Sequence, residues 1–176
     1  MDSAQDSSVE ESARSARSAT SRLPQESRTL AQVPGMRVTV DYLGLDERWI
    51  EWSDIDDLQV NEDGITALLA TGERCEHSFG ESRKRDRVRV AQSMRERVMA
   101  SILVSAAGPE GSLVALRRKA TGHTFTRISL SGEISEAGRR GAEALATRLV
   151  ESAGLVNVPL HWSAPPAGFS ARPVLG

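Results

Sequence analysis

The chain has 176 residues, of which 39% are hydrophobic and 26% are charged. This length suits one domain with a modest core, because single domains centre on roughly 100–150 residues. The formal net charge of −2 gives no reason to expect a nucleic-acid partner for the chain as a whole. Cys75 is the only cysteine, which excludes an internal disulfide and favours a reducing compartment.

The start of the sequence lacks the pattern of a secretory signal peptide. Acidic residues stand where such a peptide would be basic, and no apolar segment follows them. No stretch of the sequence approaches the ~18–20 apolar residues of a membrane span. We therefore predict a cytoplasmic protein.

Three regions of different composition follow one another along the chain. Residues 1–35 are rich in Ser, Ala, Arg, Glu and Gln, and they bury too little apolar surface to offset the entropy of ordering them. We predict a disordered N-terminal arm there. Residues 36–158 have the patterning of a single folded domain. Residues 159–176 contain Pro165, Pro166 and Pro173 and are predicted to form an irregular tail.

The first part of the predicted domain is a series of short strands. Val38, Val40 and Tyr42 alternate with polar residues, which is the period of a half-buried strand. Turn signals then separate further predicted strands at residues 48–52, 65–69 and 74–79. This spacing favours an antiparallel meander.

The second part is predicted to contain two helices and a hairpin. Apolar residues recur at helical spacing over residues 81–105 and 135–153, and residues 112–118 and 124–130 suit two paired strands. We predict an α+β fold, with an antiparallel sheet or partly open barrel of about six short strands and two helices. Whether the helix within residues 83–104 interrupts one barrel or separates two layers stays open.

Candidate catalytic and metal-binding residues are few. Cys75, Glu76 and His77 are adjacent, but on a strand Glu76 points away from the other two side chains. A metal site needs three or four ligands, and a nucleophile needs a base and an oxyanion donor. Since neither set is evident, we predict no catalysis, no metal and no cofactor.

Charge is segregated along the sequence. Residues 41–63 carry nine acidic groups and one basic group, whereas residues 81–99 carry seven basic and three acidic groups. The two regions can attract each other, within one chain or across a dimer. The basic cluster can also hold an anionic lipid headgroup or a phosphate-bearing ligand, and its members are Arg83, Lys84, Arg85, Arg87 and Arg89. No aromatic residues interleave with these cations, which argues against single-stranded nucleic acid.

One short motif resembles a known family. The run Trp52-Ser53-Asp54-Ile55, which follows a predicted strand and precedes two more, resembles the Trp-x-Asp-Ile signature of bacterial PH-like domains. The resemblance covers residues 36–80, and residues 112–154 only by the order of elements, including a closing helix. It implies a binding or scaffolding module without catalytic residues. The helix at residues 81–105 departs from the family pattern.

These observations predict a non-catalytic interaction module that binds a protein partner. The predicted contact surface is an exposed tryptophan beside a set of carboxylates, namely Trp49, Glu51, Asp54, Asp56 and Asp57. One alternative is binding of an anionic ligand or membrane surface by the basic cluster. Another is an α+β dimer similar to the type III secretion chaperones, which rests on element order alone. The partner, the oligomeric state and the pathway are not specified by the sequence.

Overall fold

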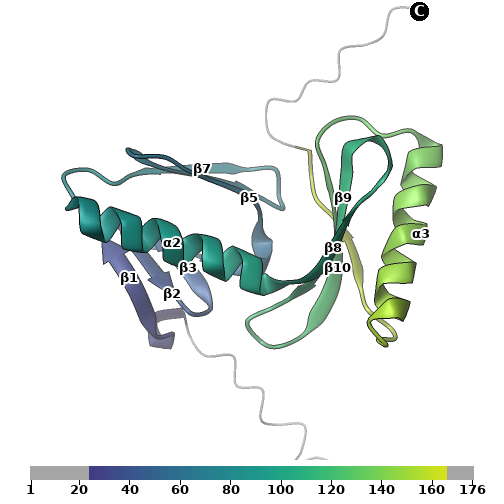
Figure 1. The fold of residues 1–176 in the computed structure, drawn as a ribbon, viewed down its shortest axis with the longest axis horizontal. Helices are drawn as coiled ribbons and strands as arrows, with labels where there is room; N and C mark the ends of the chain where they lie inside the picture. Colours follow the sequence, from purple (N-terminus) through teal and green to yellow (C-terminus); the bar gives the residue numbers. More distant parts are fainter. Residues whose placement is uncertain (1–23, 166–176) are drawn as a thin grey trace, which may run out of the picture.

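The computed structural model describes residues 24–165. In that part of the chain, eleven strands form three sheets, and two α-helices, α2 (Lys84–Ser101) and α3 (Glu136–Ser152), pack against them (Figure 1). The fold is mixed α+β, as predicted. The described residues form no closed barrel, and they contain more strands than the six expected.

The first sheet is an antiparallel meander whose strands follow the order of the sequence. Its strands are β1 (Thr29–Val33), β2 (Met36–Thr39), β3 (Tyr42–Leu45) and β4 (Arg48–Glu51). β1 lies within the arm that the sequence predicts to be disordered, so that prediction is wrong for these residues. β1 is ordered because Ala31 and Val33 are buried and the strand pairs with β2. The arm upstream of residue 24 lies outside the described residues.

A buried threonine explains why the predicted strand through Tyr42 is split in two. Thr39 Oγ1 accepts a hydrogen bond from Tyr42 N and donates one to Tyr42 O, both at 2.9 Å. These bonds form a tight turn between β2 and β3. The carbonyl of Thr39 also accepts from Trp52 Nε1 at 3.1 Å, which ties the 3₁₀ turn η2 (Trp52–Asp54) to the first sheet.

The second sheet has three antiparallel strands in the order β5-β6-β7. They are β5 (Ile55–Val60), β6 (Gly64–Leu69) and β7 (Arg74–Ser78). The turn between β5 and β6 is held by Asn61 Oδ1, which accepts hydrogen bonds from the backbone N–H groups of Asp63 and Gly64 at 2.9 and 2.8 Å. β5 and β7 are the edge strands of this sheet.

Helix α2 lies between the first two sheets (Figure 1). Val90 and Met94 on its inner face are completely buried, and they belong to a hydrophobic cluster that includes Val38 and Leu43 of the first sheet and Ile65 of the second. The helix therefore packs against both layers, which answers the question that the sequence left open. Residues 24–101 form what we call the N-terminal half.

The predicted helix over residues 81–105 is wrong at its C-terminal end. α2 stops at Ser101, and Ile102 is already extended, with φ −98° and ψ 118°. The next residues form β8 (Ile102–Ala107), which pairs with β9. The apolar residues Ile102 and Leu103 continue the helical spacing, but they are equally compatible with a strand, and pairing with β9 decides between the two.

The third sheet has the order β11-β10-β9-β8 and makes up the C-terminal half, residues 102–165. The paired strands β9 (Ser112–Arg118) and β10 (Thr124–Leu130) agree with the predicted hairpin. β11 (Leu160–Trp162) runs parallel to β10, after the chain crosses over through α3. It lies in the tail that the sequence predicts to be irregular, so that prediction is wrong for these residues; residues 166–176 lie outside the description.

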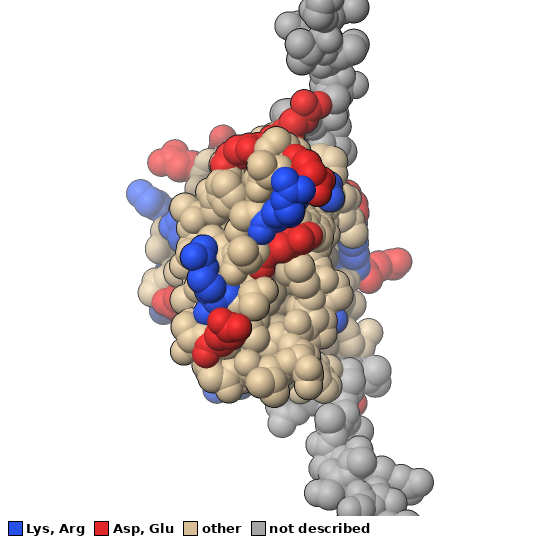
Figure 2. Space-filling view, turned by 90° about the vertical axis from the view of Figure 1, so that its right-hand side faces the viewer, with Lys and Arg blue, Asp and Glu red and all other residues tan. Residues whose placement is uncertain are grey.

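A second, smaller hydrophobic cluster joins α3 to this sheet. Val114 and Ile128 from the strands meet Ala142 and Ala146 from the helix. Figure 2 views the molecule from the α3 side, where acidic and basic side chains are interspersed. No single sign of charge dominates this face, so it offers no directed electrostatic attraction for a charged partner.

The start of α3 is packed closely against the 3₁₀ turn η3 (Pro109–Gly111). A Cβ atom on Gly138 would lie 2.7 Å from Ile134 Cγ1 and 2.8 Å from Glu110 Cδ. A Cβ atom on Gly141 would lie 3.1 Å from Pro109 Cγ. The glycines of the first turns of α3 are thus explained by close packing on η3.

Candidate functional site

The predicted acidic surface lies where the two halves of the molecule meet. Arg127 of β10 approaches two of its carboxylates, with 3.4 Å from Nη2 to Asp54 Oδ1 and 3.9 Å from Nη1 to Asp56 Oδ1. Glu51 Oε1 accepts a hydrogen bond from the backbone N–H of Ala120, in the loop after β9. Three of the predicted partner-binding carboxylates therefore contact the chain's own C-terminal half.

Arg117 of β9 completes this contact, which we call the seam. Its side chain is buried, and Nη1 donates to the carbonyl oxygens of Ser53 at 2.8 Å and Ile55 at 2.7 Å. Burial lowers the pKa of Arg117, while the charge of Asp56 acts in the opposite direction. The corner between β4 and β5 is consequently bound by two arginines of the third sheet.

The two other residues of the predicted surface stand apart from the seam. Trp49 is half-buried on β4, where its ring covers Gly44 so closely that a Cβ atom there would lie 2.8 Å from Cζ3. Arg37 lies over the same ring, 5.8 Å from its centroid. Asp57 is exposed on β5 and accepts a hydrogen bond from Gln59 Nε2 at 3.3 Å. The predicted five-residue surface is thus divided among different environments.

Within the basic cluster at the start of α2, Arg87 stabilises the local structure. Arg87 donates to three backbone carbonyls, those of Ser82 at 2.7 Å, Gly80 at 3.0 Å and Glu62 at 3.3 Å. It thereby ties the first turn of α2 to the β7–α2 loop and to the β5–β6 turn. The side chains of the remaining cations make no hydrogen bond or ion pair within residues 24–165, and these residues are Arg83, Lys84, Arg85 and Arg89.

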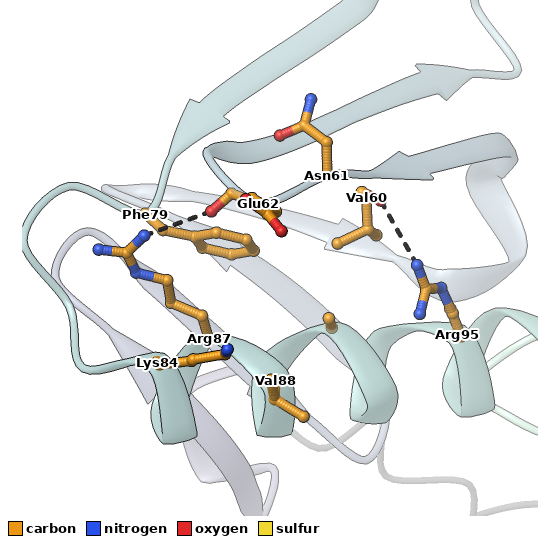
Figure 3. A pocket seen from close by; sticks show the side chains of 9 residues that line it. Val60, Asn61, Glu62, Phe79, Lys84, Arg87, Val88 and Arg95 are labelled. Carbon is orange, nitrogen blue, oxygen red and sulfur yellow. Dashed lines mark hydrogen bonds between the residues drawn. The ribbon is translucent and has the colours of Figure 1, made fainter.

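A groove of about 500 Å³ runs between α2 and the β5–β6 turn (Figure 3). Its walls combine apolar side chains with three cations and one carboxylate, and the lining consists of Val60, Asn61, Glu62, Phe79, Lys84, Arg87, Val88, Ala91 and Arg95. This groove was not predicted from the sequence. The one sequence signal for the groove is Val88, an apolar residue outside the buried stripe of α2 that is 56% exposed in the structure.

The outer edge of strand β5 lies beside this groove. Asn61 N donates to Gly64 O at 3.0 Å, so this pair is hydrogen-bonded across the hairpin. Bonded and non-bonded pairs alternate along antiparallel strands, which directs the N–H and C=O groups of Leu58 and Val60 away from β6. The contact from Arg95 Nη2 to Val60 O, at 3.4 Å, agrees with this direction.

Cys75 and His77 both lie on β7, and each has its own set of neighbours. His77 Nε2 is 3.1 Å from the carbonyl oxygen of Pro34. Burial raises the pKa of the Cys75 thiol, although nearby Arg48 acts in the opposite direction. Arg48 pairs with Glu73 and lowers the pKa of that carboxyl group. Within the described residues, no group of three or more His, Cys, Asp or Glu side chains is placed to hold a metal ion.

No protein-family model, no curated protein and no solved structure matches the chain. Among residues 24–165, no helix has the length and apolar character needed to cross a membrane.

Proposed function

We propose that the protein is a non-catalytic, PH-like interaction module that binds an extended, acidic segment of a partner protein in the groove between α2 and β5. The observation that carries this proposal is the combination at one place of a sheet edge, apolar side chains and three cations without an ion pair among the described residues. A strand added to a sheet edge gains affinity from its main chain and specificity from alternate side chains.

The arrangement of the N-terminal half supports the PH-like part of the proposal. A four-stranded and a three-stranded antiparallel sheet are followed directly by a helix that packs on both. The Trp-x-Asp-Ile motif lies at the junction of the two sheets, where Trp52 and Ile55 are buried and Trp52, Ser53 and Asp54 form the 3₁₀ turn η2. We infer that α2 occupies the position of the closing helix of a PH-like domain, although the sequence pattern had favoured the later helix α3 for that position.

The charges along the groove favour an acidic occupant. Lys84 has no ion pair among the described residues, and Arg95 is exposed apart from its long contact with Val60. Val88 lies between these cations along α2 (Figure 3), and it lines the groove together with Ala91. An extended segment with one apolar side chain between carboxylates matches this pattern.

Selection from a phage-displayed library of random peptides tests the proposal. We expect enriched peptides to share an apolar residue flanked by Asp or Glu. On binding, the amide hydrogens of Leu58 and Val60 should become protected from exchange, because they would enter a β-ladder. Val88→Asp should weaken binding of the selected peptides by ~10-fold or more, since it replaces an apolar side chain of the groove lining by a carboxylate that repels acidic peptides.

The matched control is Val156→Asp, which introduces the same charge at a valine that is 81% exposed and outside the groove. It should leave peptide affinity unchanged. Enrichment of basic peptides would contradict the proposal. Protection from hydrogen exchange at Trp49 and Asp57, with none at Leu58, would also contradict it and would indicate that peptides bind the acidic surface predicted from the sequence.

Binding to an anionic surface is a second candidate, favoured by the four unpaired cations at the start of α2. Like charges that lack internal partners are available to lipid headgroups. Vesicles that contain phosphatidylserine should then co-sediment the protein at low salt and release it at high salt. Absence of co-sedimentation at low salt would remove this candidate.

A further inference from the structure

The N-terminal arm of the chain contains the kind of segment that the groove between α2 and β5 favours. Residues 1–12 lie outside the described part of the chain. They include no Lys or Arg and four carboxylates, which are Asp2, Asp6, Glu10 and Glu11. Val9 is the only large apolar residue within residues 2–22. One apolar side chain therefore stands between carboxylates, as in the peptides that we expect the groove to bind.

The groove has the opposite charge. Its lining includes three cations, Lys84, Arg87 and Arg95, and one carboxylate, Glu62. None of these side chains forms an ion pair among the described residues. The adjoining residues 83–89 carry five basic groups and one acidic group. The acidic part of the arm and the wall formed by α2 are thus complementary in charge.

The spacing of the charges agrees as well. Lys84 and Arg95 are the first and last groove residues of α2 (Figure 3), and they lie ~17 Å apart along the helix axis at ~1.5 Å per residue. Asp6 and Glu11 would lie ~17 Å apart in an extended chain, at ~3.3 Å per residue. The outer carboxylates of the segment can therefore meet the outer cations of the groove.

The apolar residue of the segment falls at a matching position. Val88 lies ~6 Å along α2 from Lys84, and Val9 would lie ~7 Å from Glu11 in an extended chain. With Glu11 at Lys84, Val9 reaches Val88, whose side chain is 56% exposed. Contact between the two valines removes apolar surface from water, which is favourable.

The connection to the described domain is long enough for this contact. Strand β1 borders the first half of α2, where Thr29 and Leu30 line a common cavity with Asp86 and Arg89. Residues 12–23 can span at most ~40 Å, whereas α2, with its 18 residues, is ~27 Å long. A tether of this kind gives the segment an effective concentration on the order of 1 mM at the groove, so even a weak contact competes with a partner.

We propose that residues 6–11 occupy the groove of their own chain and compete there with the partner segment. This inference rests on the proposed function, because it concerns the regulation of the same groove. A partner must displace the arm, so its apparent affinity is lowered by the fraction of molecules in which the groove is open. The arm of a second copy has the same sequence but lacks the advantage of the tether.

A spin label tests the contact without any partner. In the whole chain carrying Cys75→Ser, a nitroxide attached at Ser8→Cys should broaden the NMR amide signal of Val88. Adding Val9→Ser should relieve this broadening, because it removes the apolar contact. A nitroxide at Ser152→Cys, at the end of α3, is the control and should leave the signal unchanged.

The affinity of the whole chain for the selected peptides tests the regulation. Val9→Ser leaves the charge unchanged and should strengthen peptide binding at least ~3-fold, because the groove is then open in more molecules. The triple variant Asp6→Asn, Glu10→Gln and Glu11→Gln should strengthen it at least ~5-fold. Val156→Ser, at an exposed valine outside the groove, should leave the affinity unchanged.

The outcomes separate this inference from the proposed function. Broadening at Val88 with no enriched peptide would support the arm contact and remove the partner segment. Enriched peptides without broadening, or peptide affinity unchanged by Val9→Ser, would overturn the arm contact and leave the proposed function intact. Broadening in an isotope-labelled chain that carries no nitroxide, when it is mixed with nitroxide-labelled chains, would assign the groove to the arm of a second copy and would also overturn the proposal.

Discussion

Arg117 is a charged side chain that is only 2% exposed, and its Nη1 serves two backbone carbonyls. Taking a guanidinium out of water costs several kcal/mol, and here the carbonyl oxygens and the nearby carboxylates offset that cost. Truncating the side chain would leave the carbonyls of Ser53 and Ile55 buried without a donor. The corner that carries the Trp-x-Asp-Ile motif therefore depends on a residue far from it in sequence.

We expect Arg117→Ala to lower the free energy of unfolding by ~3 kcal/mol, because it removes a buried charge and two hydrogen bonds together. Urea denaturation followed by tryptophan fluorescence measures this change. The neighbouring Arg118→Ala is the matched control, since Arg118 is exposed, and its effect should stay within ~0.5 kcal/mol. Equal effects of the two substitutions would refute the structural role of Arg117.

The two tryptophans of β4 and η2 differ in their predicted contributions to stability. Trp52 is 3% exposed and hydrogen-bonded, whereas Trp49 is half-buried on the opposite side of the sheet. Trp52→Ala should therefore cost ~3–5 kcal/mol, and Trp49→Ala about 1 kcal/mol. Similar losses in thermal or urea denaturation would mean that the sheet faces are wrongly assigned.

At the scale of elements, the two helices begin differently. Arg83 at the start of α2 gives no side-chain cap, but Ser135 Oγ accepts from Gly138 N at 3.0 Å at the start of α3. The same hydroxyl donates to Glu110 Oε1 at 2.6 Å, and Glu110 Oε2 accepts from Ser135 N at 2.7 Å. These two hydrogen bonds fix the start of α3 to η3.

We predict that Ser135→Ala lowers the free energy of unfolding by ~1 kcal/mol, the usual effect of losing a helix cap. It should also raise the pKa of Glu110, because the Ser135 hydroxyl is the main cause of its lowered value and the backbone N–H the second. An NMR titration of the Glu110 carboxyl group measures the pKa. Ser152→Ala, at the other end of the helix, should leave that pKa unchanged.

The sign of the pH dependence follows from the lowered pKa. A carboxyl group that ionises more readily in the folded state stabilises the fold above its unfolded pKa. The stabilisation by Glu110 is then lost as the pH falls through the folded pKa. In the Ser135→Ala variant, the free energy of unfolding should therefore decrease less on acidification.

Elements with strong local patterns were predictable, and those defined by pairing were not. α3 and the β9–β10 hairpin have clear periodicity and glycine-containing turns, and they lie where the sequence placed them. β8 follows α2 without a break in apolar spacing, and β11 is a three-residue strand that exists through its parallel pairing with β10. Only the tertiary partner distinguishes such segments from a helix end or a tail.

At the scale of the whole molecule, the charge segregation of the sequence was only partly informative. It allowed attraction between the acidic region 41–63 and the basic region 81–99. In the structure, Arg87 reaches a backbone carbonyl of that acidic region, while the carboxylates of Asp54 and Asp56 meet Arg127. The composition showed that acidic residues are concentrated at 41–63. It could not identify Arg127 as a partner of Asp54, because the two residues are 73 positions apart and are brought together only by the fold.

A double-mutant cycle on Asp56 and Arg127 tests whether the seam contributes energy across the two halves. Both side chains are at least nine-tenths buried, with 6% and 8% exposure. We expect a coupling energy of ~1–2 kcal/mol from the alanine variants in urea denaturation. The exposed pair Glu136 and Arg140 is the control, with expected coupling below ~0.5 kcal/mol. Equal coupling in both cycles would show that the seam carries no special stability.

The order of strands has a consequence for how quickly the chain folds. Every antiparallel pairing joins strands that are neighbours in the sequence, so each hairpin closes only a short loop. The bonds from Arg117 to Ser53 and Ile55, by contrast, span 64 and 62 residues. Because folding rates fall as contacts become more distant in sequence, we expect each half to collapse early and the arginine contacts to form after the rate-limiting step. Substitutions at Arg117 should then accelerate unfolding and leave the refolding rate almost unchanged.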